Sequence, residues 1–229
     1  MSDPTLVLVA HGTRSPVGVA TVARLAELVA DRIGPVRVAF VDVLGPTPSE
    51  VLSEIDGPAV LMPAFLASGY HVRVDLPEHV RLSGRDDVRV TAALGPDPAL
   101  ADVMMSRLRS AGWRSGDHVV LAAAGSSDPD ALADVATAAA HLAERIGAPV
   151  DVGYAATATP TVADAVSVAR AGGARRVVVA AYLLAPGLFH TRLSGAGADA
   201  VTEPLGADDA LADLVAARFR THAAALTAR

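Results

Sequence analysis

Cysteine is absent from this chain of 229 residues. Its absence excludes disulfide bonds, thiolate zinc sites, cysteine-ligated iron–sulfur clusters and cysteine nucleophiles. Any bound metal must therefore be held by nitrogen and oxygen ligands, which suit first-row divalent ions at exchangeable sites. Aromatic residues are scarce at 3%, whereas apolar residues make up 52%. The core must therefore be aliphatic, as in parallel strands that helices cover on both faces.

Long apolar runs, a leader segment and basic stripes are also lacking. No apolar run approaches the roughly 20 residues of a membrane span, so the mean hydropathy of +0.39 reflects core volume. The first residues lack the basic patch and apolar stretch of a signal peptide. No dense stripe of Lys and Arg accompanies the net charge of −6. We therefore expect a cytoplasmic protein with no membrane segment and no nucleic-acid partner.

Continuous β-branched runs alternate with segments whose apolar residues recur at helical spacing, which predicts an α/β fold. In the first half, the expected strands are residues 5–10, 36–43, 59–64 and 88–92, and the expected helices are 17–33, 48–55, 77–82 and 98–111. In the second half, the expected strands are 118–123, 150–155 and 176–181, and the expected helices are 130–146, 161–171 and 209–227.

The two halves repeat each other at the level of individual residues. The sequence LGPDPALAD at 94–102 matches LGADDALAD at 205–213, and His71-Val-Arg73 matches His190-Thr-Arg192. The simplest account is duplication of a unit of about 110 residues. We predict two similar doubly wound parallel-sheet domains that face each other across a cleft. Their predicted bounds are 1–113, which carries the functional site, and 114–229, a degenerate copy.

Ligands of open parallel sheets bind beyond the carboxyl ends of the strands, so polar residues at strand ends are the candidates. His11 follows the first strand, Asp42 lies late in the second, and His71 lies in the loop after the third. Two imidazoles and a carboxylate suit Fe(II), Co(II), Ni(II) or Zn(II) with open coordination positions. The second half has Ala124 and Ala156 in place of His11 and Asp42. This asymmetry indicates one functional site and one relic.

Structural roles are the alternatives for these residues. A single histidine at a strand end is usually a hydrogen-bonded structural residue, and Asp42 could serve a turn or a helix cap. The segment after His71 could begin a helix with Asp75 as its N-cap and Pro77 at its N1 position.

Cationic and small residues near the same strand ends predict a large anionic ligand. Guanidinium groups bind carboxylates through paired hydrogen bonds, although each arginine could equally be solvated surface charge. Small residues leave space for a flat ligand and expose backbone N–H donors. The predicted substrate contacts are Arg14, Ser15, Ser68, Gly69, Arg73, Ser126, His190 and Arg192.

Four segments carry a family resemblance: LVLVAHGTRSP, AFVDVLGPTPSEVL, PAFLASGYHVRVDLP and LGPDPALADV. Together they resemble the sirohydrochlorin chelatases of siroheme and cobalamin biosynthesis, which are class II chelatases that need no ATP. The resemblance covers essentially the whole chain. It implies that His11 and His71 bind the metal and that one of them accepts protons leaving the pyrrole nitrogens. The family usually has Glu where this chain has the shorter Asp42, which leaves room for a water between Asp42 and the ion.

The resemblance implies insertion of a divalent metal into sirohydrochlorin with release of two protons. Iron is favoured because siroheme is needed wherever sulfite or nitrite is assimilated, and cobalt is the alternative. The metal is then a substrate, no tightly bound cofactor is expected, and a monomer suffices. A non-catalytic carrier of metal or tetrapyrrole is the competing hypothesis. A histidine phosphatase is disfavoured, because Ala10 stands where that class has an arginine before the histidine.

Overall fold

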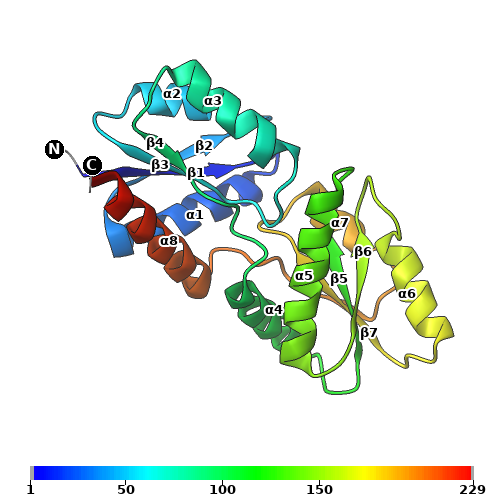
Figure 1. Cartoon of the computed structure of the whole chain (residues 1–229). Helices are drawn as coiled ribbons and strands as arrows, with labels where there is room; N and C mark the ends of the chain where they lie inside the picture. Colours follow the sequence, from blue (N-terminus) through cyan, green and yellow to red (C-terminus); the bar gives the residue numbers. More distant parts are fainter. Residues whose placement is uncertain (1–2, 228–229) are drawn as a thin grey trace. The chain divides into compact units, whose positions relative to one another are not determined.

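The first sheet has four parallel strands in the order β2-β1-β3-β4 (Figure 1). The bounds are Thr5–Ala10 for β1, Val36–Phe40 for β2, Ala59–Pro63 for β3 and Val88–Val90 for β4. These elements belong to a computed structural model that describes residues 3–227. Strands β1 and β3 are central, and helices bury both of their faces, which explains their continuous apolar sequences.

Helices cover both faces of this sheet. Figure 1 shows α2 and α3 on one face and α1 and α8 on the other. The bounds are Pro16–Ile33 for α1, Pro48–Ser53 for α2, Leu76–Ser83 for α3 and Asp209–Thr227 for α8. A short π-helix, η1 (His71–Asp75), leads directly into α3. Ser15 is the N-cap of α1 and Thr47 is the N-cap of α2, and each side chain accepts a backbone hydrogen bond from the first turn of its helix.

The second sheet repeats the first, with four parallel strands in the order β6-β5-β7-β8. The bounds are His118–Ala123 for β5, Val150–Tyr154 for β6, Val177–Tyr182 for β7 and Ala200–Val201 for β8. Its helices are α4 (Pro98–Ser110), α5 (Pro129–Ile146), α6 (Val162–Ala171) and α7 (Leu188–Leu193). The predicted α/β class with two parallel sheets is confirmed. The sequence patterns did not predict α7 and β8, which are too short to show a period.

The two halves share a strained detail at the ends of their first two strands. Gly12 has φ of +100°, and a Cβ atom there would lie 2.0 Å from the carbonyl oxygen of Asp42. Gly125 has φ of +98°, and a Cβ atom there would lie 1.9 Å from the carbonyl oxygen of Ala156. Only glycine permits both the left-handed conformation and this close approach of two backbone segments. The duplicated glycines thus let the first two strands of each sheet pair beyond their regular ends.

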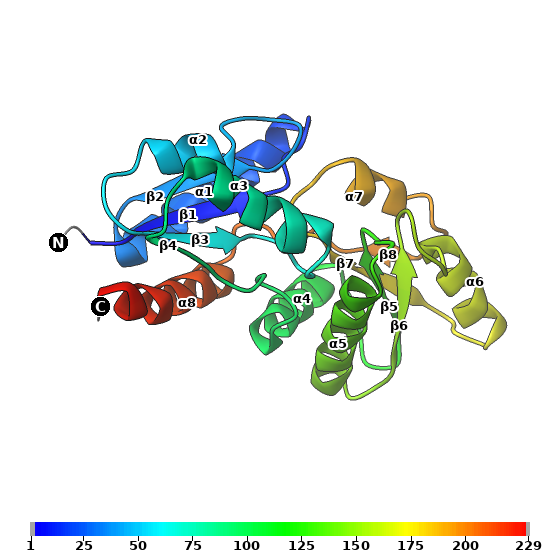
Figure 2. The same ribbon diagram turned by 45° about the horizontal axis from the view of Figure 1, so that its top comes forward.

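The compact units do not follow the sequence repeat. One unit contains residues 1–94 and 207–229, and the other contains residues 95–206. Helix α8 packs against α1 and β3 of the first unit, and α4 packs against α5 and β7 of the second (Figure 1, Figure 2). The predicted division into 1–113 and 114–229 therefore describes the duplicated sequence, whereas each half gives its last helix to the other unit. The apolar faces of α4 and α8 are too alike to show this exchange in the sequence.

Two equivalent arginines hold the exchanged helices in place. Arg218 of α8 donates hydrogen bonds to the carbonyl oxygens of Ala93 and Leu94, the latter at 3.1 Å. Arg107 of α4 donates to the carbonyl oxygens of Pro204 and Leu205, the latter at 2.6 Å. In each unit, the helix that comes from the other half of the sequence thus binds the segment at which the chain leaves that unit. The two halves exchange their last helices through equivalent hydrogen bonds.

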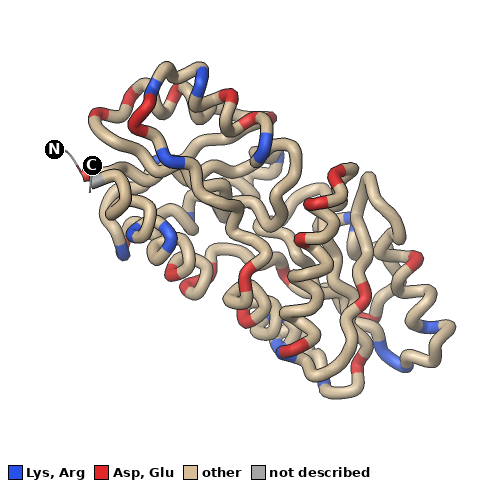
Figure 3. Tube along the Cα trace, viewed as in Figure 1, with Lys and Arg blue, Asp and Glu red and all other residues tan. Residues whose placement is uncertain are grey.

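Acidic and basic residues are interspersed along the traces of both units (Figure 3). Across residues 3–227, no helix combines the length and the apolar content that crossing a bilayer requires.

Candidate metal centre

The strand order places the candidate histidines on neighbouring strands. The chain moves from β1 to β2 on one side and then returns to β3 on the other, so the topological switch lies between β1 and β3. His11 directly follows β1, and His71 begins η1 in the connection after β3. The carboxyl ends of these two strands are therefore where a doubly wound sheet binds its ligands.

The structure brings the two imidazoles into contact. Their ring centroids are 4.6 Å apart and the rings are nearly perpendicular, at 84°. Phe65, in the loop after β3, lies beside both: its centroid is 6.1 Å from that of His71 and 6.4 Å from that of His11. The predicted convergence of His11 and His71 is thus present, although 60 residues separate them in the chain. Sequence reasoning missed Phe65, whose only signal is an aromatic residue just after a buried strand.

Hydrogen bonds fix the same tautomer on both rings. The Nδ1 atom of His11 lies 3.2 Å from the carbonyl oxygen of Gly12, and the Nδ1 atom of His71 lies 2.6 Å from Oδ2 of Asp75. A carbonyl or carboxylate oxygen can only accept, so each Nδ1 carries the hydrogen. In the neutral form of each ring, Nε2 then has a free lone pair. Neutral imidazoles held in this way are the usual form of histidine metal ligands.

Asp75 is a positioning residue that the sequence reasoning treated only as a helix cap. Asp75 does occupy the N-cap position of α3, but its backbone is helical (φ −69°, ψ −42°) and its side chain makes no cap hydrogen bond. Instead its carboxylate pairs with His71 from the far end of the five-residue π-helix. π-helical turns occur often at functional sites. The spacing of four residues between His71 and Asp75 is the signal that could have identified the pair.

Asp42 lies beside His11 through its backbone, since its N–H donates to the carbonyl oxygen of His11 at 2.9 Å. Its exposed side chain turns to the next residue, where Oδ1 accepts from the N–H of Val43 at 2.7 Å. Among residues 3–227, no group of three or more His, Asp or Glu side chains is close enough to hold one ion. Asp42 as third ligand therefore stays a prediction, and the histidine pair is the part of the triad that the structure assembles.

The predicted substrate contacts of the first unit lie around the same sheet edge. Arg14 is exposed between β1 and α1, and Arg73 is exposed within η1. The hydroxyl of Ser15 caps α1 by accepting from the N–H of Gly18 at 3.4 Å. Ser68 and Gly69 precede η1, and the carbonyl of Gly69 accepts from the first N–H groups of that helix. Their contact with a substrate stays a prediction.

The remaining predicted contacts belong to the second unit. His190 of α7 donates from Nε2 to the carbonyl oxygen of Thr202, the residue after β8, at 2.9 Å. Among residues 3–227, no hydrogen bond to Nε2 of His71 is present. Arg192 lies over the ring of Phe189, with 5.9 Å between Cζ and the ring centroid. Ser126 accepts from the N–H of Asp128 at 3.0 Å. His190 thus has a structural hydrogen bond that His71 lacks.

Removing the Asp75 carboxylate is expected to weaken metal binding without unfolding the protein. Residues that orient a histidine ligand typically contribute about 10- to 100-fold to metal affinity. We expect this loss for Asp75→Ala and a smaller one for Asp75→Asn, whose amide oxygen can still accept from Nδ1. Titration with Co2+, followed by its visible absorption, measures the affinity. Equal affinity in wild type and Asp75→Ala would mean that the carboxylate does not position His71.

Known proteins resemble the chain over nearly its full length. The CbiX family profile matches residues 5–111 and again 118–222. A sirohydrochlorin cobaltochelatase of Methanothermobacter thermautotrophicus is 27% identical over 130 residues, covering 46% of this chain and 91% of that relative. One of Methanopyrus kandleri is 29% identical over 137 residues, covering 46% of this chain and 95% of that relative. Each relative therefore corresponds to one copy of the repeat.

Solved structures share the fold of both units. SirB from Bacillus subtilis with Fe3+ superposes with a TM-score of 0.80 at 22% identity, covering 97% of this chain and 96% of that one. CbiX, described as the terminal enzyme for siroheme biosynthesis in denitrifying bacteria, gives a TM-score of 0.67 at 23% identity, covering 95% and 98%. The fold and the histidine pair thus define an α/β protein made of two chelatase-like units. The chain belongs to the CbiX family, the family of sirohydrochlorin chelatases.

Proposed function

We propose that the protein is a sirohydrochlorin chelatase that inserts Fe2+ or Co2+ into its macrocycle without ATP. The relatives at 27% and 29% identity are sirohydrochlorin cobaltochelatases, and similar structures contain Fe3+ or cobalt. The observation that carries the proposal is the pair of perpendicular imidazoles 4.6 Å apart at the switch point of the first sheet. The metal is a substrate of this reaction, held on the protein only until the ring takes it.

The separation of the rings fits two ligands of one ion. A nitrogen–metal distance of about 2.1 Å places each ring centroid about 3.2 Å from the ion. Two ligands at about 90° then have centroids about 4.5 Å apart, whereas a tetrahedral angle gives about 5.2 Å. The observed 4.6 Å between the ring centroids is close to the separation expected for two ligands in adjacent positions when both Nε2 atoms point at the ion. Such a pair leaves the opposite side of the ion open, as transfer to a planar set of four nitrogens requires.

The chemical step exchanges ligands and protons in balance. Two bonds from the ion to imidazole Nε2 atoms break, four bonds to pyrrole nitrogens form, and two pyrrole N–H protons leave. As the ion departs, each Nε2 regains a lone pair and can accept a proton, because neutral histidine is basic enough for this near pH 7. Holding metal and ring together converts a bimolecular encounter into an intramolecular step. The hydrogen bond from Nδ1 of His71 to Asp75 keeps this ring in the tautomer whose Nε2 can bind the ion and then accept a proton.

Anaerobic mixing of the protein with sirohydrochlorin and either ion tests the proposal. We expect the absorbance change of metallation to be faster than in the protein-free control, with two protons released per metal inserted. The ion that gives the larger kcat/KM identifies the physiological substrate. A spectrum that shifts on ring binding without any acceleration of metallation would contradict the proposal and favour a carrier.

A further inference from the structure

Exposed apolar side chains gather at one edge of the first sheet. Across the described residues of the first unit, five large apolar side chains are exposed. Four of them lie in the segments that come after β1, β2 or β3 and before the helix that follows is complete: Val17 (61% exposed), Val43 (46%), Tyr70 (61%) and Val74 (45%). We call these four residues the apolar rim. The fifth, Leu82 (59%), lies in the last turn of α3, which runs back toward the amino ends of the strands.

The apolar rim shares its edge with the histidine pair. Parallel strands place all their carboxyl ends on one side, so the segments after β1, β2 and β3 meet there. The ring centroid of Tyr70 is 6.1 Å from that of His71, and the rings are perpendicular at 83°. Single exposed apolar residues are ordinary, but a group of them around convergent polar side chains is typical of a ligand site.

The fold does not require an apolar residue at the most strained rim position. Val43 has φ of +66°, which is rare for a β-branched residue. The second unit repeats this turn with Thr157 at φ of +63°, so a polar β-branched residue adopts it as well. The second unit lacks the histidine pair, because Ala124 replaces His11. An exposed valine at this turn therefore occurs only in the unit that has the histidine pair, and the turn itself does not require it.

We infer that the apolar rim binds the apolar face of the macrocycle, an inference that rests on the proposed function. A conjugated tetrapyrrole is a flat apolar disc with carboxylates at its edge. Cations stand beside the rim residues in the sequence, since Arg14 comes between His11 and Val17, and Arg73 comes between Tyr70 and Val74. Apolar side chains beside the metal ligands thus receive the disc, and guanidinium groups meet its charged edge. Removing the disc face from water supplies the binding free energy.

Titration of the metal-free protein with metal-free sirohydrochlorin, under anaerobic conditions, tests the inference. Val43→Thr and Val74→Thr keep the side-chain shape and are each expected to raise Kd about 4-fold. Tyr70→Ala is expected to raise it about 10-fold, and Tyr70→Phe to leave it nearly unchanged. The matched control is Leu82→Thr, an equally exposed residue outside the rim, which should bind as wild type does. Co2+ affinity without the ring should be the same in all variants, since no rim side chain is a proposed ligand.

The outcomes separate this inference from the proposed function. If wild type metallates sirohydrochlorin and the rim variants bind the ring as tightly, the rim inference is wrong and the proposed function stands. If wild type neither binds nor metallates the ring, the proposed function itself fails, and the rim inference with it. If the rim variants instead change the oligomeric state in light scattering, the rim binds a second copy of the chain and the inference is overturned.

Discussion

Alanine at His11 or at His71 is expected to lower the rate of metallation by at least about 100-fold. Each substitution removes one of the two Nε2 donors that the structure brings together, and a single imidazole does not hold an exchangeable divalent ion in a defined place. Both rings are at least partly exposed, so the loss is one of chemistry and not of folding. Stopped-flow absorbance with sirohydrochlorin and Fe2+ or Co2+ measures the rate.

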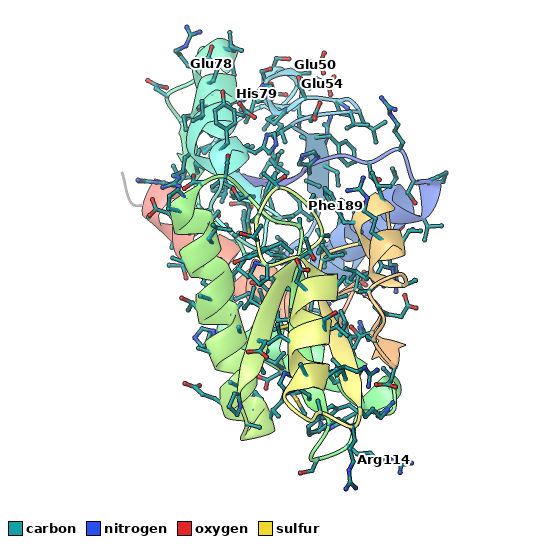
Figure 4. The ribbon with its side chains drawn as sticks, turned by 90° about the vertical axis from the view of Figure 1, so that its right-hand side faces the viewer. Glu50, Glu54, Glu78, His79, Arg114 and Phe189 are labelled. Atoms are coloured by element: carbon teal, nitrogen blue, oxygen red, sulfur yellow. The ribbon has the colours of Figure 1, made fainter. Side chains whose placement is uncertain are left out.

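A third histidine supplies the matched control. His79 lies on α3 of the same unit (Figure 4). Its Nδ1 atom is 3.1 Å from Oγ of Ser49. Among residues 3–227, no ring contact joins His79 to His11 or His71, so His79→Ala should metallate at the wild-type rate. Binding of the metal-free ring should be nearly unchanged in all three variants. Undiminished metallation by His11→Ala or His71→Ala would remove the histidine pair from the reaction.

The sequence predicted the histidine pair because its signal is local to each strand end. A continuous apolar strand fixes where the chain leaves the sheet, and the order of strands then fixes which exits are neighbours. Asp75 and Phe65 escaped this reasoning because their roles depend on side-chain direction in an irregular loop. The π-helix is what aims Asp75 at His71 instead of at the first turn of α3. Hydropathy patterns carry no information about such a turn.

The division into compact units escaped prediction for a different reason. Helices α4 and α8 begin within equivalent sequences of the repeat, LGPDPALAD at 94–102 and LGADDALAD at 205–213. A repeat shows which segments are related but not which copy a segment packs against. Local sequence therefore predicts both helices and leaves their packing partners open, because those partners are chosen by contacts 98 and 124 residues away in the chain.

Alanine at Leu211 is expected to destabilise the first unit, and alanine at Leu100 the second. These leucines are equivalent in the repeat and fully buried, at 0% and 1% exposure. Leu211 lies on α8, which packs on α1 and β3, and Leu100 lies on α4, which packs on α5 and β7. Each substitution leaves a cavity and should cost about 2–5 kcal/mol of unfolding free energy.

Hydrogen exchange read by mass spectrometry distinguishes the two assignments, because it reports local stability along the chain. With exchanged helices, Leu211→Ala accelerates exchange in β1 and β3 and leaves β5 and β7 protected, and Leu100→Ala does the reverse. If α4 and α8 instead packed within their own halves of the sequence, Leu211→Ala would affect β5 and β7, and Leu100→Ala would affect β1 and β3. The same pair of variants also separates stability from chemistry. Since the histidine pair lies in the first unit, metallation at raised temperature should fail earlier in Leu211→Ala than in Leu100→Ala, although the two leucines are equivalent in the repeat.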